Sequence, residues 1–146
     1  MVQGMDDPLS QFPGYVLRRA SIATIGRLHD HLAAHDLRAT EASLIILMRD
    51  REGITQSEAG RVLGIKRANM VPLTAKLEAR GFLTRTQMDG RSQGLALTKA
   101  GLAILRRVRA AIAKHEDETM ARVPEDLRAH VIPILTAIWG QEGPDD

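Results

Sequence analysis

Cysteine is absent from the 146 residues of this chain, and aromatic side chains make up only 3% of them. Without thiols the chain has no disulfides, no thiolate metal ligands and no cysteine-based redox switch. The scarcity of aromatic rings argues against proteins that hold RNA or single-stranded DNA by stacking bases on Tyr, Phe or Trp. Readout of duplex DNA does not depend on such rings.

Long apolar runs and an export signal are missing too. The longest apolar runs, residues 44–48 and 131–135, are much shorter than the roughly 20 residues of a membrane-spanning helix. The N-terminus shows no basic segment that leads into an apolar stretch. We therefore expect a cytoplasmic protein, and the length and 44% apolar content predict a single domain with a core of ordinary size.

Charge is distributed unevenly along the chain. Between Thr55 and Arg109, 11 Lys or Arg and 3 Asp or Glu give a net charge of +8, whereas the other residues carry 9 basic and 15 acidic groups, a net −6. A basic segment in an otherwise acidic chain is typical of proteins that bind the phosphates of nucleic acids. We expect residues 55–109 to face those phosphates.

Apolar periodicity and capping signals predict a mainly α-helical chain with one small β-hairpin. Expected helices begin at Pro13, at a Thr40 cap, at a capping box formed by Thr55 and Glu58, after Gly64, at a Thr98 cap, and at Pro124. The first four helices are expected to end near residues 34, 49 (before Gly53), 63 and 80. The fifth helix includes the apolar residues Leu102, Leu105, Val108 and Ile112. The last helix is expected to continue to Trp139, with a kink at Pro133. The hairpin strands are expected at 82–86 and 93–98, around the turn Asp89-Gly90.

Residues 55–81 have the pattern of a helix-turn-helix. A small residue, Gly60, stands where the two helices cross, and Gly64 stands at the turn. The apolar residues that lock the helices together are Ala59, Leu63, Ile65, Met70 and Leu73. Taken alone, this pattern also fits an ordinary αα-hairpin, and the following strands also fit a plain solvated hairpin. Their succession favours a winged helix-turn-helix, whose basic wing tip enters or borders the minor groove.

At these residues the chain resembles the MarR family of bacterial transcription regulators. The resemblance rests on residues 60–81, on Asp89-Gly90-Arg91 in the wing and on residues 95–101 at the exit into the next helix, and it extends over about 13–139. It implies one domain, 1–146, in which a winged helix-turn-helix lobe (40–98) is flanked by dimerisation helices (13–35 and 99–140). It also implies a homodimer with two recognition helices in successive major grooves of a partly palindromic duplex operator.

Carried onto this sequence, the resemblance gives a set of expected DNA-binding residues. Asn69 is expected to read adenine bidentately, and Arg91 to reach the groove from a wing loop fixed by an ion pair between Asp89 and a nearby Arg. Pro72 departs from the polar or basic residue that is commoner in the family at its position. The full set is Arg61, Lys66, Arg67, Ala68, Asn69, Val71, Lys76, Arg85, Asp89 and Arg91.

The resemblance further implies a repressor released by a small aromatic or phenolic ligand, such as an acid, aldehyde or thioester. The expected ligand-binding residues on the first helix are Tyr15, Arg18, Arg19, Ser21, Ile22 and His29. Structural ion pairs or dimer hydrogen bonds are the alternative for Arg18 and His29. The expected dimer anchors are Leu9, Phe12, Tyr15, Val131, Leu135, Ile138 and Trp139, with packing inside one chain as the alternative.

Two other functions remain open from the sequence. The spacing of His31 and His35 on one helical face, near His29, is compatible with a zinc-responsive regulator of the same fold. A winged helix that binds proteins is the second alternative. We expect no metal and no cofactor in the main interpretation, and no enzyme, because the chain has no Cys nucleophile, phosphate-binding Gly-rich loop or nucleophile elbow.

Overall fold

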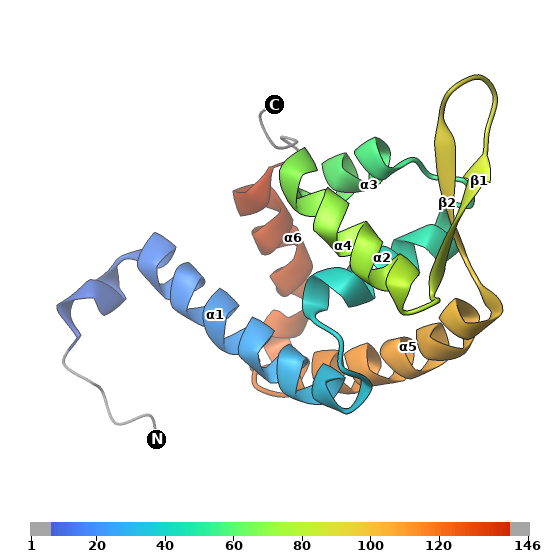
Figure 1. The fold of residues 1–146 in the computed structure, drawn as a ribbon. Coiled ribbons are helices and arrows are strands. Elements are labelled where there is room, and N and C mark those ends of the chain that lie inside the picture. The colour runs from blue at the N-terminus through green and yellow to red at the C-terminus, as the bar shows by residue number, and fades with distance from the viewer. Residues whose placement is uncertain (1–6, 141–146) are drawn as a thin grey trace.

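The computed structural model describes residues 7–140 as a mainly helical chain with a two-stranded wing (Figure 1). Its helices are α1 (Pro13–Leu32), α2 (Ala39–Asp50), α3 (Gln56–Leu63), α4 (Arg67–Ala79), α5 (Lys99–Met120) and α6 (Arg128–Trp139), and its strands are β1 (Leu83–Gln87) and β2 (Gln93–Leu97). Short 3-10 turns lie at Pro8–Gln11, Ala33–His35 and Glu125–Leu127. The predicted winged helix-turn-helix with additional terminal helices is confirmed.

Helix ends follow several of the predicted signals. The Thr55 backbone N–H donates to the Glu58 carboxylate at 2.9 Å, and the Glu58 N–H donates to the Thr55 hydroxyl at 3.2 Å, which completes the capping box. Gly64 ends α3 with φ +64°, in the left-handed conformation that favours glycine. The Thr98 hydroxyl accepts from the Gly101 N–H at 3.0 Å and begins α5.

Two predicted boundaries were wrong. Helix α2 is capped at Arg38, two residues before the predicted Thr40, because the Glu41 carboxylate accepts the Arg38 N–H at 2.9 Å. The end of the same helix at Asp50 agrees with the predicted end near residue 49, and Gly53 lies in the following loop with φ +78°. Pro124 precedes only a 3-10 turn, so α6 begins at Arg128.

The core lies where α2, α3, α4, the wing and α5 meet. The buried apolar residues are Leu32, Leu37, Ala42, Leu44, Ile45, Met48, Ile54, Ala59, Met70, Leu77, Leu83, Leu95, Ile104, Leu105 and Val108. Gly60 is buried at the crossing of α3 and α4, where an added Cβ would lie 3.0 Å from the Ile65 carbonyl oxygen. Leu102 was expected on the inner face of α5 but is 39% exposed, and Ile104 is buried instead.

The wing is attached to the helix-turn-helix by backbone pairing. Strands β1 and β2 are antiparallel, with Leu83 opposite Leu97 and Gln87 opposite Gln93. The Leu95 N–H donates to the Ile54 carbonyl at 2.8 Å, beside a bridge between Thr55 and Gly94. The loop that leads into α3 therefore pairs with β2 through one isolated bridge, and the wing is held in place against α3.

The two terminal arms of the chain, which are the segment from Pro8 through the N-terminal half of α1 and the helix α6, carry exposed apolar side chains. No residue of α6 is buried, and Ile132, Ile138 and Trp139 are 75%, 60% and 74% exposed. In Figure 1 the N-terminal half of α1 reaches away from the other helices. Among residues 7–140, no helix combines the length and the apolar character needed to cross a membrane.

Candidate nucleic-acid interface

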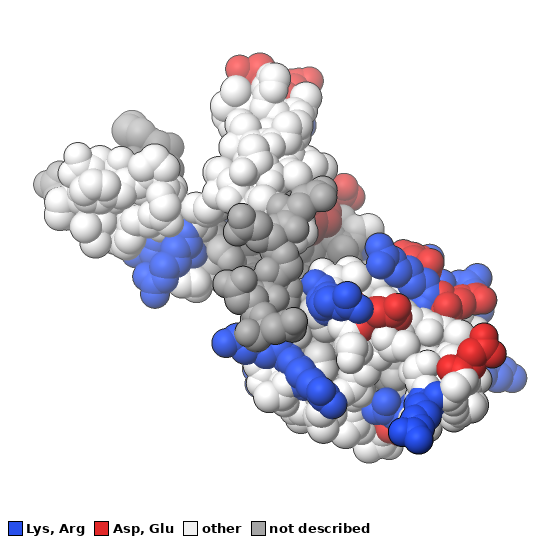
Figure 2. Space-filling view, turned by 90° about the horizontal axis from the view of Figure 1, so that it is seen from above, with Lys and Arg blue, Asp and Glu red and all other residues white. Residues whose placement is uncertain are grey.

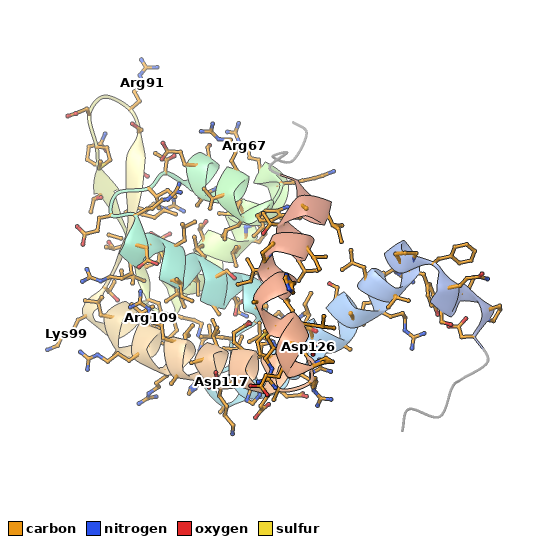
Figure 3. The ribbon with its side chains drawn as sticks, turned by 180° about the vertical axis from the view of Figure 1, so that it is seen from behind. Arg67, Arg91, Lys99, Arg109, Asp117 and Asp126 are labelled. Atoms are coloured by element: carbon orange, nitrogen blue, oxygen red, sulfur yellow. The ribbon has the colours of Figure 1, made fainter. Side chains whose placement is uncertain are left out.

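The start of α4 is presented outwards by the packing of α4 on α3. The buried side of α4 consists of Met70, Thr74 and Leu77, while residues 66–69 at its start are exposed. Arg67 at the start of α4 and Arg91 at the tip of the wing lie on the same side of the molecule (Figure 3). The two elements therefore face one surface, as a recognition helix and a wing require.

Basic side chains are spread over the lobe formed by α3, α4 and the wing. Figure 2, seen from above, shows Lys and Arg side chains around the exposed surface of this lobe, with fewer acidic ones among them. The exposed basic residues predicted to bind DNA are Arg61, Lys66, Arg67, Lys76 and Arg91. A surface of this charge favours the approach of a polyanion.

The predicted base-reading residues are all exposed on α4. Ala68 and Asn69 are exposed in its first turn, and Val71 is 54% exposed although it is apolar. The structure thus leaves these three side chains available for contact, and their contact with bases remains a prediction.

Arg85 is held within the protein, at the base of the wing. Its guanidinium donates to Gln56 Oε1 at 3.2 Å, to the Thr74 hydroxyl at 3.2 Å and to the Glu78 carboxylate at 3.4 Å. These partners belong to α3 and α4, so Arg85 joins β1 to both helices of the helix-turn-helix. The sequence suggested a groove contact for Arg85, and its geometry favours a structural role.

Lys76 also has an internal partner. Its Nζ lies 2.7 Å from the carboxylate of Glu41, which is only 3% exposed. A buried carboxylate without a cation is costly, so Lys76 compensates Glu41 and joins α4 to the start of α2. The remaining exposure of the Lys76 side chain, 46%, leaves part of it free to face a phosphate.

The wing tip is held differently from the prediction. None of the ion pairs found within residues 7–140 includes Asp89, so the expected pair between Asp89 and an Arg is not formed. Instead Gln87 Nε2 donates to the Gly90 carbonyl at 2.8 Å, and the Ser92 hydroxyl donates to the Asp89 carbonyl at 3.2 Å. Side-chain amide and hydroxyl groups thus replace the ion pair, and the Arg91 guanidinium extends from the tip.

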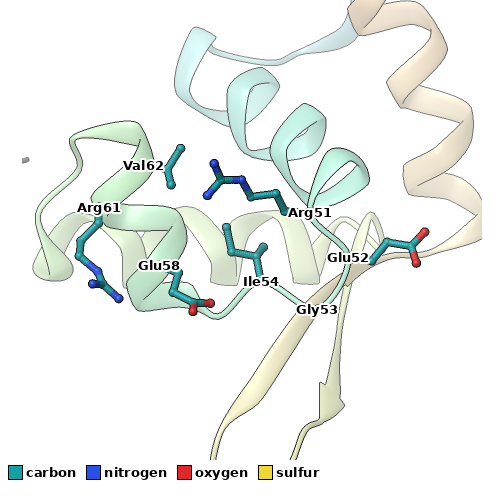
Figure 4. A pocket seen from close by; sticks show the side chains of 7 residues that line it. All are labelled: Arg51, Glu52, Gly53, Ile54, Glu58, Arg61 and Val62. Atoms are coloured by element: carbon teal, nitrogen blue, oxygen red, sulfur yellow. The ribbon is translucent and has the colours of Figure 1, made fainter. Parts of the chain in front are cut away.

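A hollow of about 490 Å³ opens between α3 and the loop that precedes it (Figure 4). Arg51, which the sequence analysis did not single out, points across this hollow towards Val62, and Arg61 stands on its rim. The Thr55 backbone N–H, the Thr55 hydroxyl and these two guanidinium groups lower the pKa of the Glu58 carboxyl. Arg51 lies before the basic segment 55–109 in the sequence, so its place beside Arg61 on the charged surface follows from the fold and not from the sequence pattern.

Comparisons with known proteins agree with this geometry. A family model described as the MarR family matches residues 35–92. A solved structure of the transcriptional repressor CouR bound to a 23-mer DNA duplex is 32% identical, covers 92% of this chain and 96% of that chain, and has a TM-score of 0.85. The chain belongs to the MarR family. It is therefore a DNA-binding transcription regulator and not an enzyme, as the sequence predicted.

Two further relatives extend the comparison of this MarR-family chain. CouR bound to p-coumaroyl-CoA is 32% identical, covers 91% of this chain and 95% of that chain, and has a TM-score of 0.84. A putative transcriptional regulatory protein for the hcr operon of Thauera aromatica is 23% identical over 88% of this chain and 80% of its own length.

Helix α1 of this MarR-family chain contains the residues predicted to bind a ligand. Arg18, Ser21 and Ile22 are exposed, and His29 is half-buried. The Tyr15 hydroxyl donates to Asp7 at 2.6 Å and accepts from Arg19 at 3.0 Å, and the hydrogen bond from Tyr15 is the main reason that the pKa of Asp7 is lowered. The hollow of Figure 4, and a second one of about 440 Å³ beside the wing, are lined by other residues than these. Within one chain the six predicted residues line neither hollow.

The histidines are arranged otherwise than the zinc alternative requires. His31 Nε2 lies 2.8 Å from Glu118 on α5, and its ring meets that of the buried His115 edge to face at 5.9 Å. The hydrogen bond to His31 lowers the pKa of Glu118. Within residues 7–140 there is no group of three or more His, Asp or Glu side chains able to hold a metal ion. His31 instead joins α1 to α5.

Proposed function

We propose that this protein is a homodimeric repressor whose hold on a partly palindromic operator is released by an aromatic acid or its thioester. The observation that carries the proposal is the 32% identity, over nearly the whole chain, to a repressor known both on duplex DNA and with p-coumaroyl-CoA. Each α4 helix enters a major groove, and each wing tip follows the neighbouring backbone or minor groove.

The exposed apolar arms support the dimer. A monomer would leave Ile132, Ile138 and Trp139 in water, together with Leu9 and Phe12 at the other end of the chain, which are 46% and 53% exposed. A second copy with the same arms buries these surfaces by two-fold symmetry. We assign residues 13–35 and 99–140 to dimerisation and 40–98 to the DNA-binding lobe.

The proposed DNA contacts divide into two groups. Asn69 and its neighbours Ala68 and Val71 face base edges, whereas Arg61, Lys66, Arg67 and Arg91 contact phosphates or the minor groove. Lys76 and Arg85 support the interface from behind, because the Lys76 ammonium already pairs with Glu41 and the Arg85 guanidinium already donates to side chains of α3 and α4. Asp89 contributes its backbone to the wing turn.

The proposed ligand lies against α1, with Arg18 and Arg19 near its anionic group and Tyr15, Ser21, Ile22 and His29 around its ring. Helix α1 is connected to the recognition helix, because the Arg80 guanidinium at the end of α4 donates to the carbonyls of His35 and Asp36 just after α1. A ligand that favours another angle of α1 therefore changes the spacing of the two α4 helices and weakens DNA binding.

The test is a band-shift titration of a duplex selected by this protein from a randomised pool. We expect p-coumaroyl-CoA to weaken binding at least about tenfold, which corresponds to a coupling of about 1.4 kcal/mol. Separate titrations with coenzyme A alone and with free p-coumarate measure how much each half of p-coumaroyl-CoA contributes to this effect. If p-coumaroyl-CoA binds the protein in calorimetry but leaves the band shift unchanged, the proposal of ligand release is wrong.

A variant and a matched control locate the ligand. Arg18→Ala should weaken the effect of p-coumaroyl-CoA and leave DNA binding without ligand unchanged. Arg38→Ala removes an exposed Arg side chain just before α2, outside the segments assigned to dimerisation and to DNA binding, and should change neither measurement. An equal response of both variants to p-coumaroyl-CoA would remove Arg18 from the site.

A further inference from the structure

One row of exposed residues along the recognition helix, between its exposed polar residues, carries no polar side chain. Because Met70, Thr74 and Leu77 face the core, the spacing of 3.6 residues per turn puts a different row on the opposite side of α4. That row, here called the outer stripe, consists of Ala68, Pro72, Ala75 and Ala79, and all four residues are exposed. No side chain of the outer stripe donates or accepts a hydrogen bond.

Val71 borders the outer stripe and is 54% exposed, the largest apolar side chain on the outer part of α4. Pro72 follows it inside the helix, where proline removes one backbone donor and is normally unfavourable. Its ring is a rigid apolar surface that faces away from the core. The helix thus presents small or branched apolar groups where a hydrogen-bonding reader of bases would have amides or guanidinium groups.

Only one base edge in the major groove matches such a surface. Guanine, cytosine and adenine offer hydrogen-bond donors and acceptors there, whereas thymine adds a C5-methyl group. The short side chains of the outer stripe also allow the helix backbone to lie deep in the groove. Arg67 and Lys66 at the start of α4, and Arg61 on α3, supply the surrounding positive charge. This charge favours DNA over a protein partner for the apolar surface.

We propose that the outer stripe and Val71 recognise the C5-methyl groups of thymines in each half of the operator. Sequence preference then comes largely from apolar contact, with Asn69 at the edge of the stripe adding a polar contact. The inference rests on the proposed function in one respect, namely that α4 enters the major groove.

The experiment replaces single thymines of the operator by deoxyuridine, which differs only by the missing methyl group. A duplex is first selected by the full-length protein from a randomised pool, and each thymine is then replaced in turn. We expect one or more positions in each half-site at which uracil weakens binding about fourfold, the effect of one buried methyl group. Equal binding of every uracil duplex overturns the inference.

Two variants connect the effect to the helix. Val71→Ala should weaken binding to the thymine duplex and should no longer distinguish thymine from uracil at one position. Val62→Ala on α3, where Val62 is 41% exposed, is the matched control and should keep the full discrimination. If Val71→Ala distinguishes thymine from uracil at every position as the wild type does, Val71 does not contact a thymine methyl group. A failure to select any duplex counts instead against the proposed DNA-binding mode.

Discussion

Two arginines of the wing, only six residues apart in sequence, have different surroundings. Arg85 has three hydrogen-bond partners on α3 and α4, and its side chain is 28% exposed. Arg91 extends from the tip of the wing, and no ion pair found within residues 7–140 includes it. The same residue type thus holds the wing in place at one position and is available to DNA at the other.

This difference predicts opposite outcomes for two alanine variants. Arg91→Ala should weaken binding to all duplexes alike and reduce the slope of log affinity against log salt by about one, with no change in thermal stability. Arg85→Ala should lower the free energy of unfolding by about 1–2 kcal/mol, because the hydrogen bonds at the base of the wing are lost. Salt-dependent band shifts and thermal unfolding measure the two effects, and a loss of stability in Arg91→Ala would contradict the assignment.

Among the structural elements, α3 depends most on its first turn, because it has only eight residues. Thr55 and Glu58 satisfy each other's backbone donors there, and Thr55 also belongs to the bridge with Gly94 of β2. The capping box therefore positions both the helix and the wing. The hydrogen bonds from Thr55 keep the pKa of the Glu58 carboxyl below its usual value of 4.5.

The lowered pKa gives a definite direction of pH dependence. A carboxyl with a lowered pKa in the folded state stabilises the protein above its unfolded pKa, and this contribution is lost as the pH falls through its folded pKa. We expect Glu58→Gln to be less stable than wild type at neutral pH, with the difference shrinking below pH 4.5. Thr55→Ala should cost about 1 kcal/mol at neutral pH. Urea unfolding at several pH values is the measurement, and a pH-independent difference for Glu58→Gln contradicts the argument.

At the scale of the whole molecule, the terminal arms matter because a single chain does not bury them. Ile138→Glu introduces a charge at a residue that is 60% exposed in the single chain. If that residue lies in the dimer interface, the substitution should convert the dimer to monomers in light scattering. Affinity for the operator should fall by about 100-fold or more, because two linked lobes no longer bind together.

Val62→Glu is the matched control for this prediction, since it puts the same charge on an exposed apolar position of α3. It should leave the oligomeric state unchanged. A dimer that persists in Ile138→Glu with wild-type stability would locate the interface elsewhere.

Features that depend on neighbouring residues were predictable from the sequence. The capping box at Thr55, the left-handed Gly64 and the Asp89-Gly90 turn each fix local geometry, and from them the order of the helices and the wing follows. The α2 boundary was missed because the Arg38 N–H finds the Glu41 carboxylate, a competing cap that contains no Ser, Thr, Asp or Asn.

The parts of the candidate site that depend on tertiary contacts were not predictable in this way. Lys76 was expected to bind phosphate because it is basic and lies on the recognition helix, but its partner Glu41 is 35 positions away in sequence. The pairing of Arg85 with Gln56 likewise depends on how β1 folds back on α3. A basic residue on a DNA-binding lobe can bind a phosphate of DNA or a partner within the protein, and the packing around the residue decides which of the two it binds.

Helix α5 begins at the exit of the wing and continues without interruption to Met120, shortly before α6. Its 22 residues make a rod of about 33 Å. A rod of this length acts as a lever, since a tilt of 5° about one end displaces the other end by about 3 Å. A change near residue 115 that tilted α5 by this angle would therefore displace its wing end by about the size of one base-pair step.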